Sequence, residues 1–108
     1  MVFDTQTLSR LAERCLELSM AGALPPETRA QYYAHAKRLR ELVMQLLSAR
    51  FDANSSEFKQ ATDAMHDTNH ALAEAAEDLN KITQAVGRLT ALAGYLDKAL
   101  GVAGRVLS

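Results

Sequence analysis

Residues 58–107 read FKQATDAMHDTNHALAEAAEDLNKITQAVGRLTALAGYLDKALGVAGRVL. Core-type residues recur through this stretch at alternating spacings of three and four, and Thr68 is the only polar residue in the row. The row consists of Phe58, Ala61, Met65, Thr68, Leu72, Ala75, Leu79, Ile82, Val86, Leu89, Ala93, Leu96, Leu100, Ala103 and Leu107. This alternation is typical of a helix that packs one face against another helix. No Pro or turn cluster interrupts it, so it predicts one helix of about 50 residues, about 75 Å long at 1.5 Å per residue.

The first half of the chain predicts two shorter helices. Asp4 or Thr5 can cap the first of them, and Pro26 suits the first turn of the second. A segment of Asp, Asn and Ser at residues 52–56 separates the second helix from the long third one. The predicted helices span residues 5–22, 27–51 and 56–106. We therefore expect a single all-α domain over residues 1–108, a three-helix antiparallel hairpin or bundle with a long C-terminal heptad helix.

Three glycines raise a structural alternative. Gly87, Gly94 and Gly101 recur every seven residues beside the heptad row. Each weakens a helix by about 1 kcal/mol relative to Ala, although small residues also let a second helix come close. A four-helix bundle with a break near Gly87 is the alternative to the long helix.

Composition limits the class of protein. Of 108 residues, 48% are hydrophobic, and 19 Ala and 16 Leu make up about two-thirds of these, which is typical of packed helices and excludes all-β and doubly wound folds. The formal net charge of −1 gives no global attraction to nucleic acid or acidic lipid. The lone Cys15 excludes an intrachain disulfide framework, and the first residues lack the pattern of a secretory signal. We expect a cytoplasmic protein.

Motifs that carry catalysis are absent from the sequence. It contains no phosphate-binding glycine loop, no His-Glu-x-x-His, no Gly-x-Ser-x-Gly and no redox cysteine pair. We therefore expect a non-enzymatic protein without a cofactor.

The tail of the long helix is the predicted partner-binding surface. Neither arrangement of three helices guarantees cover for its leucines, and an exposed apolar strip would be covered by another chain. The predicted partner-binding residues are Val86, Leu89, Ala93, Leu96, Leu100 and Ala103. These features favour a helical protein–protein interaction module, a small bacterial-type adaptor, chaperone or immunity-like protein that forms a homodimer.

A basic stripe on the second predicted helix gives the alternative function. Arg29, Tyr33, Lys37 and Arg40 follow one another at spacings of four, four and three. Cations interleaved with an aromatic ring can follow a phosphate backbone, and either this stripe or the tail could lie on a membrane surface. The stripe could equally meet the acidic first half of the third helix, in the same or another protomer.

Two histidines on the third predicted helix are a candidate metal site. His66 and His70 lie four residues apart, so their imidazoles share one helix face and could hold a divalent cation. No third strong ligand such as Cys lies nearby, and a solvated polar face explains the same residues.

Overall fold

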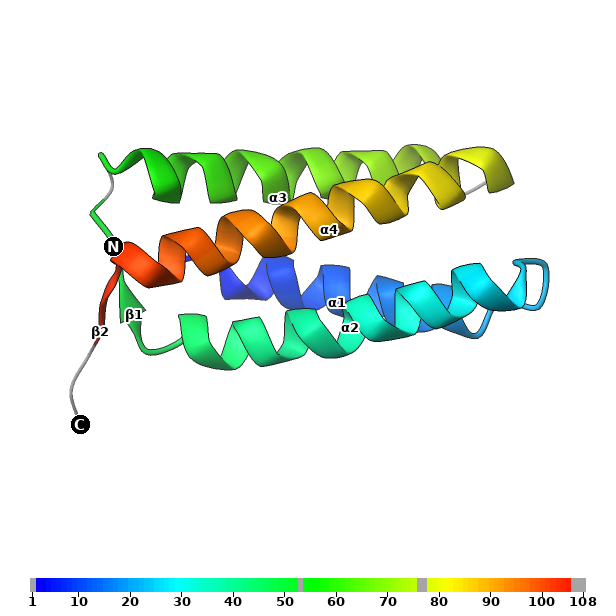
Figure 1. Cartoon of the computed structure of the whole chain (residues 1–108), viewed down its shortest axis with the longest axis horizontal. Helices are drawn as coiled ribbons and strands as arrows, with labels where there is room; N and C mark the ends of the chain where they lie inside the picture. The colour runs from blue at the N-terminus through cyan, green and yellow to red at the C-terminus, as the bar shows by residue number, and fades with distance from the viewer. Residues whose placement is uncertain (1, 53, 76–77, 106–108) are drawn as a thin grey trace.

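The computed structural model describes residues 2–52, 54–75 and 78–105, and in this part of the chain it contains four helices (Figure 1). The elements are α1 (Thr5–Ser19), α2 (Pro26–Leu46), β1 (Ala49–Arg50), α3 (Ser56–Ala75), α4 (Leu79–Val102) and β2 (Gly104–Arg105). The predicted all-α class is confirmed. α1 pairs with α2 and α3 with α4 as two antiparallel hairpins, which lie against each other.

The predicted helix over residues 56–106 is wrong, because the chain reverses between α3 and α4. Asp78 caps the start of α4: its N–H donates to the carbonyl of Ala75 at 3.0 Å, and its carboxylate accepts from the N–H of Asn80 at 3.0 Å. A 75 Å helix would also exceed the longest dimension of the molecule, 44 Å. The break does not lie near Gly87, which is inside α4.

The end of the bundle that holds the N-terminus is closed by short strands and aromatic rings. β1 and β2 are antiparallel, with Ala49 opposite Arg105 and Arg50 opposite Gly104, so the helices predicted to reach residues 51 and 106 end earlier. Beside the strands, three rings pack with centroids 5.2–6.2 Å apart. These rings belong to Phe3, Phe51 and Phe58.

The core lies between the two hairpins. Apolar side chains from all four helices are buried there, among them Leu8, Leu39, Met65 and Leu96. Burying this stripe inside one chain removes apolar surface from water, which is the physical reason for the reversal after Ala75.

Polar contacts also join the hairpins. The buried Tyr32 hydroxyl donates to the carbonyl of Ile82 at 2.5 Å, and Arg38 pairs with Asp97 at 2.6 Å. Both contacts link α2 to α4, so they fix how the two hairpins lie against each other.

The glycines of α4 have no role in packing within the chain. A Cβ built on Gly87, Gly94 or Gly101 meets nothing within 4 Å, and none of the three has a positive φ. We predict that Gly94→Ala raises the free energy of unfolding by about 1 kcal/mol, because Ala lowers the entropic cost of the helix. Urea denaturation checks this value. Ala91→Gly, on an exposed position of the same helix, should lower it by a similar amount; a loss of stability in Gly94→Ala would contradict the prediction.

Candidate functional site

The predicted partner-binding residues of the tail do not form an exposed strip. Leu89 and Leu96 are fully buried and Leu100 is 5% exposed, all within the chain's own core. Val86, Ala93 and Ala103 are partly buried and pack against that core. The expectation that these leucines need another chain for cover is wrong, since the hairpin of α3 and α4 brings α4 back onto the bundle.

His66 and His70 lie on the exposed side of α3. The Nε2 of His70 lies 3.0 Å from a carboxylate oxygen of Glu74, one turn further along the helix. Across the described ranges, no group of three or more His, Cys, Asp or Glu is arranged to hold a metal ion. The structure therefore adds no ligand to the predicted pair.

The one thiol is unsuited to nucleophilic chemistry. Cys15 is completely buried in α1, and burial raises the pKa of its thiol to about 12. The group is therefore protonated and inaccessible at neutral pH.

The basic stripe lies on the outer side of α2. Tyr33, Lys37 and Arg40 are exposed, and the ammonium of Lys37 lies 5.7 Å from the ring centroid of Tyr33. No ion pair joins Arg29, Lys37 or Arg40 to a carboxylate in the described part of the chain. The stripe therefore does not meet acidic α3 in its own chain, and the cation that does pair across helices is Arg38, on another side of α2.

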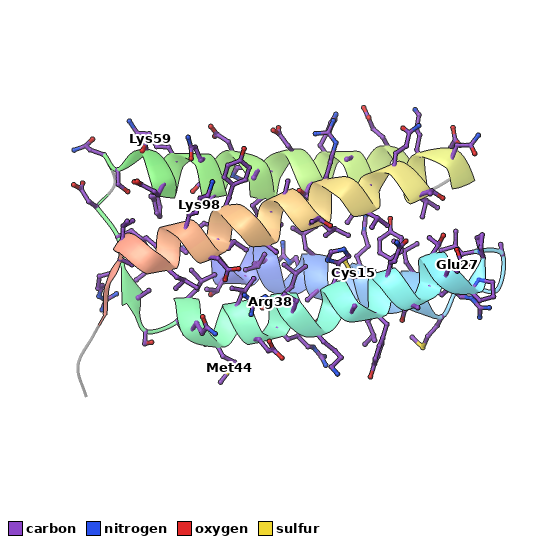
Figure 2. All side chains as sticks on the ribbon, viewed as in Figure 1. Cys15, Glu27, Arg38, Met44, Lys59 and Lys98 are labelled. Carbon is purple, nitrogen blue, oxygen red and sulfur yellow. The ribbon has the colours of Figure 1, made fainter. Side chains whose placement is uncertain are left out.

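Apolar side chains extend this stripe in both directions. Met44 is 70% exposed and Leu47 60%. Met44 follows Arg40 by four residues and Leu47 follows Met44 by three, so both share its helix face. Figure 2 shows Met44 projecting away from the bundle. At the other end, Met20, 71% exposed, lies beside the start of the stripe. We call this surface the α1/α2 face: Met20, Arg29, Tyr33, Lys37, Arg40, Met44 and Leu47.

A groove between α1 and α2 opens at one end of the α1/α2 face. Its volume is about 440 Å³. It is lined by Leu16, Ser19, Met20, Pro26, Arg29, Ala30 and Tyr33. The Nε of Arg29 is buried there and has no hydrogen-bond partner among the described residues.

The sequence pattern had revealed the cations of this surface but not its apolar half. Met44 and Leu47 belong to the largely apolar stretch of residues 42–47, and Met20 follows the apolar row of the first predicted helix, so a buried position was the usual expectation for all three. Their spacing from Arg40 and Tyr33 was the available signal, and it becomes informative once the buried side of α2 is known.

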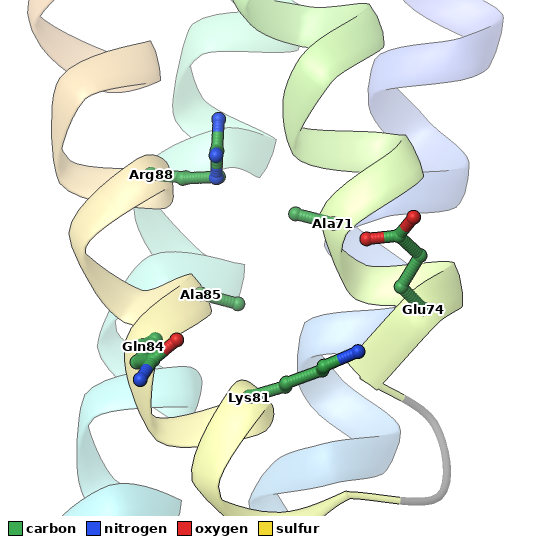
Figure 3. Close-up of a pocket in the computed structure, with 6 residues that line it drawn as sticks. All are labelled: Ala71, Glu74, Lys81, Gln84, Ala85 and Arg88. Atoms are coloured by element: carbon green, nitrogen blue, oxygen red, sulfur yellow. The ribbon is translucent and has the colours of Figure 1, made fainter.

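A second surface runs along the joint of α3 and α4. Three shallow pockets lie in a row there. The middle pocket shares Arg88 with the pocket on one side, and Ala64, Asp67 and Tyr95 with the pocket on the other. Figure 3 shows the pocket nearest the reversal, where Lys81 and Arg88 extend from α4 toward α3. We call this row of pockets the α3/α4 groove.

Comparison of the chain with protein-family models, curated proteins and solved structures finds no significant match. Within residues 2–52, 54–75 and 78–105, none of the helices combines the length and the apolar character needed to cross a membrane.

Proposed function

We propose that the protein is a non-enzymatic interaction module whose α1/α2 face binds an acidic amphipathic helix of a partner protein. One observation carries the proposal: of the six large apolar side chains that are strongly exposed in the described part of the chain, four lie on this face. They lie among cations that no carboxylate of the described residues neutralises. Apolar surface exposed together in this way is typical of a binding site.

The chemistry of the face specifies the occupant. Leu47 lies 18 residues after Arg29, a rise of about 27 Å at 1.5 Å per residue, which matches a partner helix of about five turns. Methionine side chains are flexible and adapt to apolar surfaces of different shape. Arg29, Lys37 and Arg40 would pair with Asp or Glu beside the partner's apolar stripe, and such pairs favour the correct partner over others.

A second copy of this chain fits the face poorly. Two α1/α2 faces would place cations against cations, and the exposed side of α3, which carries Asp63, Asp67 and Glu74, offers no large apolar residue for Met44 or Leu47. The partner we propose is therefore a different protein, which suits an adaptor, chaperone or immunity-like role in the bacterial cytoplasm.

Nucleic acid and membrane surfaces are the alternative ligands. Both ligands would contact the cations. A phosphate backbone, however, offers no apolar surface to Met44 and Leu47, and the net charge of −1 disfavours the binding of nucleic acid. The tail no longer supports membrane binding, since the apolar residues Leu89, Leu96 and Leu100 are buried.

The test uses a fluorescein-labelled peptide of 18 residues with leucines at helical spacing and glutamates on both flanks. We predict binding by anisotropy at low salt, with affinity reduced about tenfold or more by Lys37→Glu combined with Arg40→Glu, because two attractive contacts become repulsive. The control is Lys59→Glu, which reverses one exposed cation on α3, outside the face.

The other ligands are assayed in parallel with the same variants. A peptide in which lysine replaces glutamate should not bind. Equal loss of affinity in Lys59→Glu, or binding of a labelled DNA strand or anionic vesicles without binding of the acidic peptide, would contradict the proposal.

A further inference from the structure

The α3/α4 groove separates charge between its two walls. α3 contributes the carboxylates of Asp63, Asp67 and Glu74, whereas α4 contributes the cations of Lys81 and Arg88. The floor between the walls consists of small side chains. These are Ala64, Ala71, Ala85 and Ala91, with Tyr95 at one end.

Opposite charges on the two walls lie at matching heights. Asp67 and Arg88 line the same pocket, and Glu74 and Lys81 line the next one along the groove. The described residues nevertheless show no ion pair across the groove, and among them the one ion pair that these acids form is that of Glu74 with His70. The walls therefore present an acidic row and a basic row side by side to whatever covers the groove.

We infer that a second copy of this chain covers the α3/α4 groove in a symmetric dimer, with the two-fold axis parallel to α3 and α4. Rotation by 180° about such an axis exchanges left and right and places α3 of each copy on α4 of the other. Acidic rows then meet basic rows at both contacts, so the surface is complementary to itself, as a two-fold interface requires.

The symmetry also sets which residues meet. Rotation about an axis parallel to the helices leaves height along them unchanged. Residues that share a pocket within one chain therefore face each other between chains: Asp67 faces Arg88 of the second copy, and Glu74 faces its Lys81. A two-fold axis perpendicular to the helices would instead place α3 on α3, where like charges repel.

The size and composition of the surface predict a weak dimer. The 20 residues of α3 extend about 30 Å, and two helices about 10 Å apart offer a face at the lower end of the size of specific interfaces. Alanine provides little apolar area, so charge contributes much of the selectivity. We expect dissociation with dilution and with added salt.

Sedimentation velocity of paired charge-reversal variants tests the inference. The acid-wall variant carries Asp67→Lys and Glu74→Lys, and the base-wall variant carries Lys81→Glu and Arg88→Glu. Wild type should show a monomer–dimer equilibrium, whereas each variant alone should be monomeric because the residues that face each other across the interface then carry charges of one sign. An equimolar mixture should form a heterodimer, since both contacts become complementary again.

Circular dichroism of each variant establishes that the exposed substitutions leave the helices folded. Lys37→Glu with Arg40→Glu, which causes the same change of net charge as the base-wall variant but on the α1/α2 face, should dimerise like wild type. The inference is overturned if wild type stays monomeric, if the variants dimerise alone, if their mixture does not dimerise, or if the control variant loses the dimer. It does not depend on the proposed function, because the two surfaces and their variants are separate.

Discussion

Leu96→Asp is expected to unfold the isolated chain. Leu96 is completely buried between the hairpins, so the substitution places a carboxylate in the core and removes an apolar side chain from it. The combined cost is about 5 kcal/mol or more, comparable with the whole stability of a small domain. Circular dichroism at low protein concentration should show the loss of most helical signal.

The control variant for this experiment changes Lys98, two residues after Leu96. Lys98→Asp introduces the same carboxylate at an exposed position of α4 and should leave the helical signal intact. A Leu96→Asp chain that stayed helical and lost only its ability to associate would place Leu96 in a contact between chains, contrary to the structure.

Alkaline pH is expected to destabilise the fold by an amount on the order of 4 kcal/mol between about pH 9 and pH 12. Burial raises the pKa of Cys15 from 9.0 to about 12, and burial followed by the nearby Cys15 raises the pKa of Tyr32 from 10.0 to about 12. Between the unfolded and folded values the folded chain keeps protons that the unfolded chain releases. The free energy of unfolding therefore falls as pH rises through this window, and is unaffected by these groups below about pH 9.

Urea denaturation at a series of pH values, with a reducing agent present, measures this slope. Cys15→Ala and Tyr32→Phe should each flatten it, whereas Tyr33→Phe, on the exposed neighbouring position, should not. Each substitution also has a cost that is independent of pH, so the slope and not the absolute stability is compared. A wild-type slope of zero from pH 9 to 12 would mean that these two groups ionise without opposing the fold.

Much of the fold could be predicted from local patterns. The all-α class follows from the abundance of Ala and Leu, and the start of α1 follows from Asp4, whose carboxylate accepts from the N–H of Thr7 at 3.1 Å. Even Thr68, the one polar residue in the heptad row, is buried as the row requires, with its hydroxyl donating to the carbonyl of Ala64.

The reversal between α3 and α4 could not be predicted from the apolar pattern. Ala75 at the end of α3 and Ile82 in α4 are both buried and lie seven residues apart, as in an unbroken heptad row, because both helices turn a core face inward. Asp78 was the available signal, since Asp is favoured at the first position of a helix. An isolated Asp is ambiguous in sequence, and long-range burial decides its role.

The candidate site, like the fold, could be predicted from the sequence only in part. The spacing of Arg29, Lys37 and Arg40 revealed a basic face because charge and periodicity are local properties. The tail leucines were misassigned, because exposure depends on what the rest of the chain covers. Met44 and Leu47 were overlooked for the same reason.

The most direct test of the account is an ¹H–¹⁵N NMR titration of the labelled protein with the acidic amphipathic peptide. The proposed function predicts that amide shifts change along the α1/α2 face, from the groove near Met20 to Leu47, while amides of the α3/α4 groove change little. Shift changes confined to α3 and α4, or no changes at peptide concentrations well above that of the protein, would contradict it.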